Sequence, residues 1–277
     1  MTQQFGRQYR LEVGNATAGI AIDGLRVAFE VSKTIDSKPN PGKIQIWNLN
    51  RSNMAALLDG RYDRARLWAG YETMRVLYAG DIVKPRIKRD GMDFVLELEC
   101  GDGEVDHRTA RVSTSLAGGT RNSDALRAAA SSMGRATPGA MDVPRDTILP
   151  RGRVLNGAAR DVLTDLGADQ DADWSVQDGE LVFIPTDKVL PTDAVELSQE
   201  TGMVGGPEAT DNGLQLTCLL NPALAIGGLV RVRSILPWFD GDYKIVALQH
   251  SGDALGGDWL TKITAVGGKF KKIESKS

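Results

Sequence analysis

The sequence is poor in histidine and cysteine and has no long hydrophobic run. It contains two histidines and two cysteines in 277 residues. Cys100 and Cys218 lie in strand-like apolar runs, without another cysteine or a histidine at metal-ligand spacing, so we expect two buried thiols. No window approaches the roughly 18 consecutive apolar residues of a transmembrane helix. The N-terminal stretch MTQQFGRQYRLEVG lacks the apolar segment of a signal peptide, so synthesis in the cytoplasm is expected.

A strong charge of either sign is also lacking. The chain has 33 Lys and Arg against 36 Asp and Glu, a formal net charge of −3, and both signs are spread along it. No segment forms the basic footprint of a nucleic-acid-binding protein. With 42% hydrophobic and 25% charged residues, the composition is that of an ordinary folded protein, long enough for two or three domains.

The first and last parts of the chain have the residue pattern of β-strands. Period-two alternation recurs in LRVAFEVSK, KIQIWNL and DFVLELECG, with Gly, Asn, Asp and Pro clusters between such runs. The pair Asp90-Gly91 indicates a hairpin. RSNMAALLDG indicates one short helix, capped by Asn50 or Ser52. The last eighty or so residues return to alternating runs, so we predict a compact β-barrel or sandwich at each end of the chain.

The middle of the chain has a different pattern. NSDALRAAASSMG predicts a helix capped by Asn122 or Ser123, and NGAARDVLTDLG predicts a second helix that is capped by Asn156 and stops at Gly167. DWSVQDGELVFIP predicts a hairpin around Asp178-Gly179. We therefore predict a mainly β protein with a small α+β insertion, divided into a β domain at 1–105, a mixed module at 106–195 and a second β domain at 196–277.

Two short segments far apart in the chain have similar patterns. GKIQIWNLN (residues 42–50) and GLQLTCLLN (residues 213–221) each begin with glycine, alternate, and end in Leu-Asn. Each is followed by an apolar connector, a short basic strand and a long hairpin, which predicts a duplicated β unit. Three copies of such a chain would form a ring with pseudo-sixfold symmetry, able to dock a sixfold partner on one side and a threefold partner on the other.

The segments FEVSKTIDSKPNPGKIQIWNLN and Thr201 to Trp259 resemble the baseplate hub proteins of contractile-tailed bacteriophages. The resemblance implies a homotrimer with two tail-tube-like β-barrel domains per chain. It implies a place in the virion baseplate between the tail-tube ring and the central spike, among other baseplate proteins, with DNA only as cargo in the channel. It implies a structural protein, not an enzyme. The hubs of contractile injection and type VI secretion systems share this architecture and stay an alternative.

Protein contacts are therefore the expected functional surface. ILPWFDG places two large apolar residues side by side in a loop, which indicates contact with a partner, although a hydrophobic plug over the barrel end fits equally well. Strand residues of the two repeated segments are expected to pair or pack between neighbouring subunits. The predicted interface residues are Ile44, Ile46, Trp47, Leu214, Leu216, Pro237, Trp238 and Phe239.

Two acidic stretches have other possible interpretations. Asp169 to Glu180 follow the ligand spacing of a calcium loop, but Trp174 stands where the sharp turn requires glycine, so an acidic loop leading into a strand is favoured. CGDGEVDH brings Asp102 and His107 close in sequence, as acid–base chemistry would need, but its two glycines favour a solvated turn between domains.

No stretch of the sequence predicts a catalytic residue or a cofactor. QHSGD holds His250, Ser251 and Asp253, but neighbours in one turn cannot converge on a substrate as the members of a serine triad do. Two alternatives to a structural hub stay open. One is a cell-wall-degrading, tail-associated hydrolase, which would need one of these poor candidate sites. The other is a monomeric, carbohydrate-binding tail adhesin.

Overall fold

Alternating apolar residues build the strands of the first β unit. The structure is a computed structural model that describes residues 6–273. In β4, every second side chain is buried, as Ile44 and Ile46 are, because successive residues of a strand face opposite sides. The elements of this unit are β1 (Gln8–Gly14), β2 (Gly19–Ile22), β3 (Val27–Thr34), β4 (Asn40–Trp47), α1 (Arg51–Leu58), β5 (Arg64–Gly70), β6 (Met74–Asp90) and β7 (Asp93–Asp102).

The second β unit follows the same alternation near the C-terminal end. In β16, Leu214, Leu216 and Cys218 are buried, while the residues between them are exposed or half-buried. The unit consists of β14 (Val195–Leu197), η1 (Gln199–Thr201), β15 (Glu208–Thr210), β16 (Gly213–Leu219), β17 (Leu229–Val232), η2 (Pro237–Phe239), β18 (Gly241–Asp253) and β19 (Trp259–Gly267).

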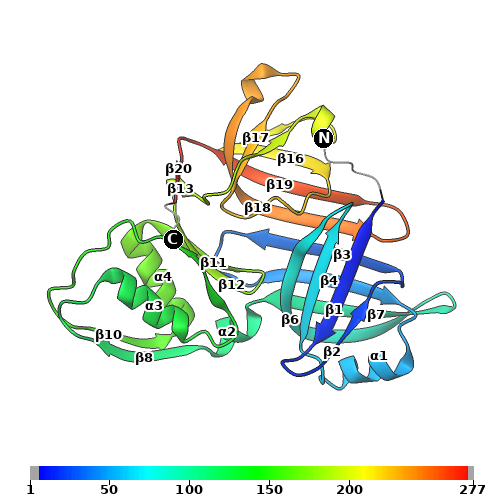
Figure 1. Ribbon diagram of the computed structural model, residues 1–277, viewed down its shortest axis with the longest axis horizontal. Helices are drawn as coiled ribbons and strands as arrows, with labels where there is room; N and C mark the ends of the chain where they lie inside the picture. The colour runs from blue at the N-terminus through cyan, green and yellow to red at the C-terminus, as the bar shows by residue number, and fades with distance from the viewer. Residues whose placement is uncertain (1–5, 274–277) are drawn as a thin grey trace.

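One continuous sheet joins the two units. Its path runs β15-β16-β19-β18-β3-β4-β7-β6-β5-β1-β2, and β14 and β17 extend from β18 to make 13 strands. The join is the antiparallel pairing of β18 with β3, near the centre of Figure 1. The mainly β prediction is confirmed, but the two predicted β-barrels are not found, because the described strands form an open sheet without a closing pair. Free backbone groups at a strand edge pair with whichever strand covers them, so two units can share one sheet.

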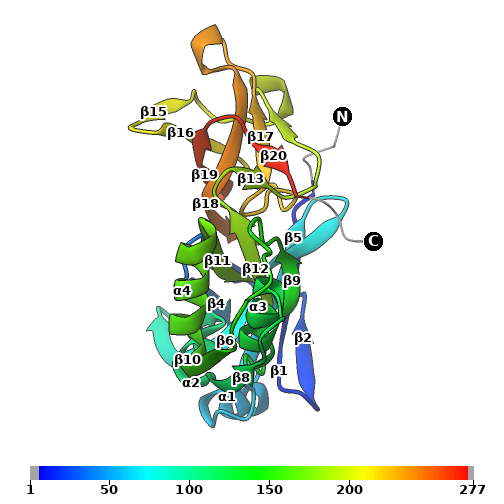
Figure 2. The same cartoon turned by 90° about the vertical axis from the view of Figure 1, so that its left-hand side faces the viewer.

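The middle module packs beside the sheet, at the left of Figure 1, with helices α3 and α4 next to each other in Figure 2. Its elements are α2 (Glu104–Thr109), β8 (Arg111–Leu116), α3 (Asn122–Ser131), β9 (Thr137–Met141), β10 (Arg153–Ala158), α4 (Ala159–Gln170), β11 (Ala172–Gln177) and β12 (Glu180–Pro185); β13 (Lys188–Val189) pairs with β20 (Lys271–Lys272). The predicted hairpin around Asp178-Gly179 is confirmed as β11–β12. None of the helices in residues 6–273 is long and apolar enough to cross a membrane.

Each part of the chain has its own apolar core. The first core draws on β1 to β7 and also takes in Leu220 and Trp259 from the second unit. The second core lies between α3, α4 and the β11–β12 hairpin. The third core lies within the second β unit. Both cysteines are free and buried, as predicted, and burial raises the pKa of Cys100 and of Cys218 to about 12.

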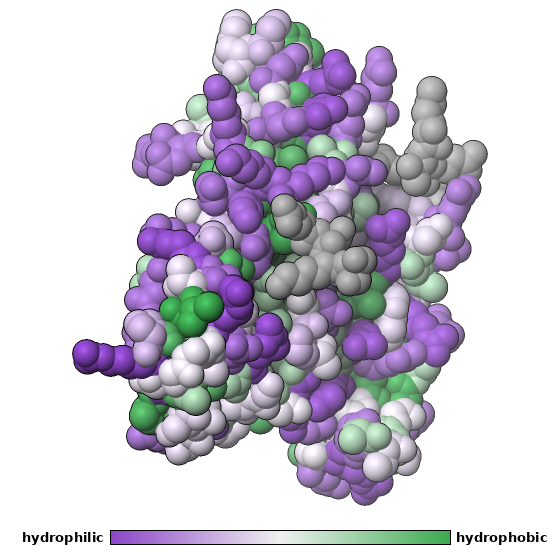
Figure 3. Space-filling view, turned by 60° about the vertical axis from the view of Figure 1, so that its left-hand side comes forward, coloured by the Kyte–Doolittle hydropathy of each residue, from purple (hydrophilic) through white to green (hydrophobic). Residues whose placement is uncertain are grey.

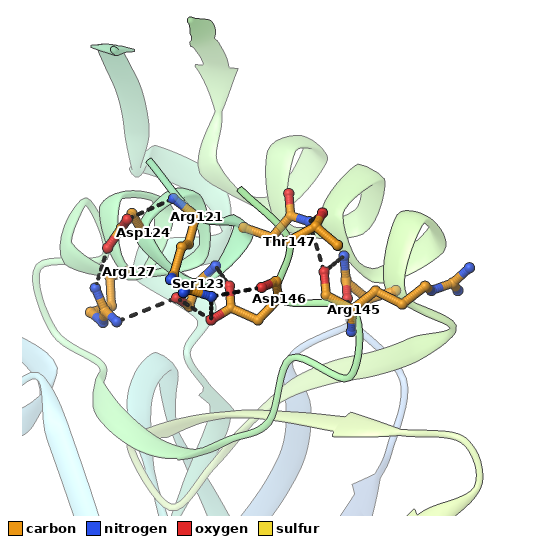
Figure 4. A network of polar contacts seen from close by, with 9 residues as sticks. Arg121, Ser123, Asp124, Arg127, Arg145, Asp146 and Thr147 are labelled. Atoms are coloured by element: carbon orange, nitrogen blue, oxygen red, sulfur yellow. Dashed lines mark hydrogen bonds and ion pairs between the residues drawn. The ribbon is translucent and has the colours of Figure 1, made fainter. Parts of the chain in front are cut away.

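The helix caps differ from the prediction, except in α1. Asn50 caps α1 by accepting the Asn53 N–H. The N-cap of α3 is Arg121, and the Ser123 N–H is accepted by Asp146 from a distant loop, in the polar network of Figure 4. Helix α4 begins only after Ala158, because Asn156 is part of strand β10. At its other end, the helix does not stop at Gly167 but continues to Gln170. Short-range capping rules could not anticipate a partner supplied by another loop.

The acidic segment after β7 is buried, so the prediction of a solvated turn is wrong. Asp102 and Asp106 are 1% and 4% exposed. Asp102 accepts the backbone N–H groups of Asp178 and Gly179, at the tip of the β11–β12 hairpin. Asp106 accepts the N–H groups of Arg135 and Ala136. Buried carboxylates of this kind need such donors. The bonds to Asp102, the last residue of β7, fasten the middle module to the sheet, whereas those to Asp106, on α2, lie within the module.

The repeat predicted from the two short segments is present in the topology. In the first unit, β4 pairs with β7, β7 with β6 and β6 with β5, all antiparallel. In the second, β16 pairs with β19, β19 with β18 and β18 with β17 in the same way. Both long strands carry a bulge at the matching place, after Ile82 in β6 and after Ile245 in β18. A shared strand order with a shared bulge is strong evidence for a duplicated unit.

The sequence alignment paired the two segments on their initial glycines, Gly42 and Gly213. In the structure, the equivalent residues are offset from that alignment by one. Ile44 lies opposite Leu98, and Leu216 lies opposite Ile263 at the equivalent place in the ladder. Ile44 therefore corresponds to Leu216, where the glycine alignment would pair it with Gln215. A slip of one residue turns every side chain to the other face of the sheet, so buried residues must align with buried ones.

Candidate functional site

Eight consecutive strands, from β15 to β6 along the path, present one polar face. Their other face carries the buried apolar residues of the first and third cores. On the polar face, charges of both signs alternate with amides and hydroxyls across neighbouring strands. We call this surface the polar face; it includes Glu30, Lys43, Gln45, Arg86, Lys88, Glu97, Glu99, Gln215, Thr217, Gln249, Ser251, Lys262 and Thr264.

Glu97 is the centre of the polar face in the first unit. Its side chain is 2% exposed and lies between Lys88, at 2.8 Å, and Lys43, at 3.1 Å. Gln45 also donates to it, at 3.0 Å. The hydrogen bonds from Lys88, and then those from Lys43, lower the pKa of Glu97 to about 2, although burial acts in the opposite direction. Two lysines thus share one buried carboxylate, which reduces the positive charge of this surface.

Replacing Glu97 by glutamine is expected to lower the free energy of unfolding at pH 7 by about 1–2 kcal/mol, since both lysines are half exposed and solvent screens them. The folded-state pKa is below the ordinary value, so the stabilisation is present above about pH 4.5 and is lost as the pH falls towards 2. Urea denaturation of both proteins between pH 7 and pH 2.5 measures this. Glu99→Gln on the same strand, whose ion pair with Arg86 is exposed, is the control. An unchanged acid profile in Glu97→Gln would contradict the assignment.

Two strand edges at the ends of this eight-strand span lack a partner strand within residues 6–273. In β6, the segment Lys84–Asp90 pairs with β7 on one side, while β5 reaches only as far as Asp81 on the other. Strand β15 pairs with β16 alone. The β6–β7 hairpin extends away from the rest of the sheet at the right of Figure 1. An unpaired edge presents a row of backbone donors and acceptors that another strand can complete.

Among the residues that the structure describes, the β17–β18 loop gathers the most exposed large hydrophobic side chains. Ile235 is 74% and Trp238 71% exposed, and Leu236 and Pro237 are exposed beside them. The loop lies at the top of Figure 1, and Phe239 near its end packs against the third core. The side shown in Figure 3 is mostly hydrophilic, with only small, separate hydrophobic areas. A cluster of exposed apolar side chains at a loop tip is typical of a contact with another protein.

The predicted interface residues divide into two groups. Ile44, Ile46, Trp47, Leu214 and Leu216 are at most 9% exposed and belong to the chain's own interior. Their packing between subunits stays a prediction, but these side chains have almost no exposed area left to bury. Pro237 and Trp238 are exposed and Phe239 half-buried, and the rings of Trp238 and Phe239 lie 6.1 Å apart. The β6 edge was not predicted from the sequence. A signal for it was available: the pair Ile82-Val83 recurs as Ile245-Val246, and the basic run KPRIKRD follows the first of the two.

The acidic segments that suggested chemistry have structural partners. Asp169 pairs with Arg153 and Asp171 with Arg145, so these two carboxylates face different arginines. No group of three or more His, Cys, Asp or Glu side chains in the described residues could hold a metal ion. Asp102 accepts two backbone N–H groups, and burial, with the nearby Asp178 carboxylate, raises its pKa to about 7.

His250 is not placed as a general base for an exposed substrate, whereas His107 is half-buried. His250 is 1% exposed, its Nδ1 lies 2.9 Å from the Thr261 hydroxyl, and burial lowers its pKa to about 3. Asp253 forms an ion pair with Arg26 at 2.8 Å. His107 lies on α2, and burial lowers its pKa.

A cleft of about 690 Å³ lies between the first β unit and the middle module. It is lined by charged groups of both signs, several of which pair with each other. Arg135 binds Asp81 and Asp63, each at 2.6 Å. These pairs hold the module against β6, through Asp81, and against the residue before β5, through Asp63.

Comparisons with known proteins find one matching family model and several similar structures. The profile of the family described as "Baseplate hub gp41" matches residues 14–254. A tail protein from Neisseria meningitidis MC58 has a similar structure, with a TM-score of 0.67, 10% identity, and coverage of 95% of this chain and 97% of that one. The 43 kDa tail protein of prophage MuSo2 from Shewanella oneidensis gives a TM-score of 0.66, 10% identity, and coverage of 94% and 97%.

A third similar structure belongs to a secretion system. The c3393 protein of E. coli is described as a component of the type VI secretion system with structural similarity to the T4 bacteriophage tail proteins gp27 and gp5. Its TM-score is 0.60 at 11% identity, with coverage of 96% of this chain and 79% of that one. At such low identities, these likenesses show the fold alone. A search of curated proteins finds no match.

Proposed function

The chain belongs to the baseplate hub gp41 family, and from this premise we propose that it is a structural subunit of a contractile phage tail, working as a homotrimer. In this proposal, three copies form a pseudo-sixfold ring in the virion baseplate, which joins the tail tube to the central spike. The observation that carries it is the duplicated unit: β4-β7-β6-β5 and β16-β19-β18-β17 share order, direction and bulge within one sheet. Three chains with two equivalent units each supply six similar positions around an axis.

The polar face is proposed to line the channel of this ring. DNA passing through a channel must not be held by rows of unpaired cations, because phosphates bind them strongly. On this face, Lys43 and Lys88 are both paired with Glu97, and Arg86 is paired with Glu99. Mixed, internally paired charges support a surface that DNA can pass. In the single chain the two tube-like units form an open sheet, and closure into a barrel is proposed only for the ring.

The ring can be tested by measuring mass and symmetry. Light scattering of the purified protein, alone and with tube or spike protein, is expected to give the mass of three chains in at least one mixture. Electron microscopy of that assembly should show threefold symmetry with six similar inner features. A stable monomer in every mixture would argue against the ring and in favour of a monomeric adhesin. Peptidoglycan cleavage by the purified protein, abolished by Asp102→Ala, would instead support the hydrolase alternative.

The β17–β18 loop is proposed to contact the tube or the spike. Trp238→Ala should change the free energy of unfolding by less than about 0.5 kcal/mol, because the side chain is 71% exposed. It should weaken binding to one of these two partners at least about tenfold, since exposed tryptophans are frequent anchors of interfaces. Leu255→Ala, which removes a 77% exposed side chain from the β18–β19 loop, is the control. Equal affinity of both variants for both partners would remove the loop from the interface.

A further inference from the structure

We infer that the β6 edge at Lys84–Asp90 of one copy pairs, antiparallel, with β15 of a second copy, in the register that places Ile87 opposite Ala209. The inference rests on the proposed ring and adds the seam that closes it. Both edges lack a partner strand in the described part of the chain. They lie at the two ends of the eight-strand span, so joining them between copies continues the same sheet.

The chain already contains one such seam, between its two units. The C-terminal half of β18 pairs with β3, with His250 opposite Val31 and Gln249 opposite Ser32. In the repeat, β6 occupies the place of β18. The free half of β6 therefore stands where β18 meets the next unit, and the seam within one chain is a template for the seam between two.

The shared bulge fixes which residues correspond in the long strands. Ile82 and Val83 correspond to Ile245 and Val246. In each pair, the isoleucine is the last residue before the register shifts, in β6 against β7 and in β18 against β19. Counting on from the bulge, Ile87 takes the place of His250. The burial differs as a missing partner would predict: His250, covered by β3, is 1% exposed, while Ile87 is 41% exposed.

The neighbouring ladders fix the correspondence of β15 with β3. Val31 lies opposite Gly42 in β4, and Ala209 lies opposite Leu214 in β16. Gly42 and Leu214 are themselves equivalent, since each precedes by two residues the matched pair Ile44 and Leu216. Ala209 therefore corresponds to Val31, and the template pairs it with Ile87. The adjacent pairs follow as Arg86 with Thr210 and Lys88 with Glu208.

Charge complementarity supports this register. The β6 edge carries Lys84, Arg86, Lys88 and Arg89, while β15 and its turn carry Glu208 and Asp211. In the template, Gln249 donates to Glu30 across the seam at 2.6 Å. Arg86 and Glu208 hold the equivalent positions, so an amide–carboxylate contact within the chain becomes a cation–carboxylate contact between chains. Opposite charges across strands favour this pairing over a shifted one.

Two prolines limit how freely these edges pair. Pro85 in β6 and Pro207 before β15 lack the N–H group that a ladder requires. In the proposed register, the two prolines lie on either side of the Ile87–Ala209 pair. Pro85 lies opposite Asp211, and Pro207 lies opposite Arg89. The backbone contribution is then concentrated at the central pair, and the side-chain charges supply the rest. Edges blunted in this way resist unspecific pairing.

The seam can be tested by a cross-link in the trimer. In the double variant Ile87→Cys, Ala209→Cys, directly opposed residues lie within disulfide range, whereas the native Cys100 and Cys218 are buried. Mild oxidation of the assembled ring should give covalently linked chains on a denaturing gel. The pair Ile87→Cys, Asp211→Cys, two residues out of register, is the control and should link at most about one tenth as much. A trimer with no excess of the predicted link overturns the seam and leaves the ring standing; no trimer in any mixture overturns both.

A charge exchange provides a second measurement. Glu208→Lys should weaken trimer formation at least about tenfold, because like charges would then face each other. Adding Arg86→Glu should recover the affinity at least about threefold but not completely, because Lys88 stays directly opposite position 208 in the proposed register. If the second change gives no recovery while both variants remain folded, Arg86 and Glu208 do not meet and the register is wrong.

Discussion

Replacing Asp178 by glycine is expected to lower the free energy of unfolding by about 3 kcal/mol. Asp178, at the tip of the β11–β12 hairpin, holds the Lys33 ammonium at 2.6 Å and also accepts the Ala79 N–H. The Lys33 side chain is only 8% exposed, so without its partner a cation would stay buried next to the sheet. Removing one member of a buried ion pair costs more than the pair contributes by itself, because the remaining charge keeps its desolvation cost. Asp102 is near enough to Lys33 to offset part of that cost.

The chain offers a matched control in Asp171. Asp178 and Asp171 both have a left-handed backbone, with φ of 57° and 51°, so glycine relieves the same local strain in both. Asp171 also forms an ion pair, with Arg145 at 2.5 Å, but both partners are more than half exposed. Asp171→Gly should therefore change stability by less than about 1 kcal/mol. Urea denaturation at pH 7 measures both variants, and equal losses would show that Asp178 adds nothing beyond its backbone conformation.

The same variant should change the titration of Asp102. Burial, and then the Asp178 carboxylate, raises the pKa of Asp102 to about 7, while Lys33 lowers it. Without Asp178, the pKa of Asp102 should fall. Because the folded-state pKa lies above the ordinary value, ionising Asp102 now costs stability as the pH rises from about 4 to 7, and this loss should be smaller in the variant.

Replacing Trp259 by alanine is expected to lower the free energy of unfolding by about 4 kcal/mol. Trp259 is 2% exposed and meets Phe29 edge to face, with ring centroids 5.3 Å apart. Trp259 is in β19 and Phe29 is in β3, and Gly252 of β18 lies between them. A Cβ on Gly252 would come within 2.6 Å of both rings, which is why glycine stands there. The pair therefore spans the join of the two β units, and its loss leaves a large cavity at that join.

Two further variants make this result specific. Trp259→Phe should cost only about 1 kcal/mol, because it keeps an aromatic ring and because the Trp259 Nε1 has no hydrogen-bond partner in the described residues. Trp238→Ala removes an equally large but exposed side chain and should leave stability nearly unchanged. Thermal or urea unfolding ranks the three. A loss below about 1 kcal/mol in Trp259→Ala would show that the join does not depend on this contact.

Local patterns predicted the elements well where the cause is local. The hairpins at Asp90-Gly91 and Asp178-Gly179 and the cap of α1 at Asn50 were predicted correctly, because turn and cap preferences depend on adjacent residues. Prediction failed where a distant partner decides. Strand β10 takes Asn156 out of α4, and Asp146 from a distant loop accepts the Ser123 N–H in the first turn of α3.

In the candidate site, too, features with a local cause could be predicted and features that depend on a distant partner could not. The exposed loop at Trp238 could be proposed from two adjacent apolar residues, and the structure places it at the surface. The free edge of β6 could not be predicted, because it depends on where β5 stops pairing. The burial of Asp102 also could not be predicted, since its donors come from a hairpin 76 and 77 residues away.

The sequence by itself determined the mainly β composition, the repeated order of strands and the mixed module between them, since alternation and turn residues act over a few neighbours. Only the tertiary structure decided that the two units share one sheet through β18 and β3, and that Ile44 corresponds to Leu216. Strand pairing joins residues far apart in the chain, and its register depends on which side chains are buried together. A pattern can therefore show that a strand forms, but not which strand completes its edge.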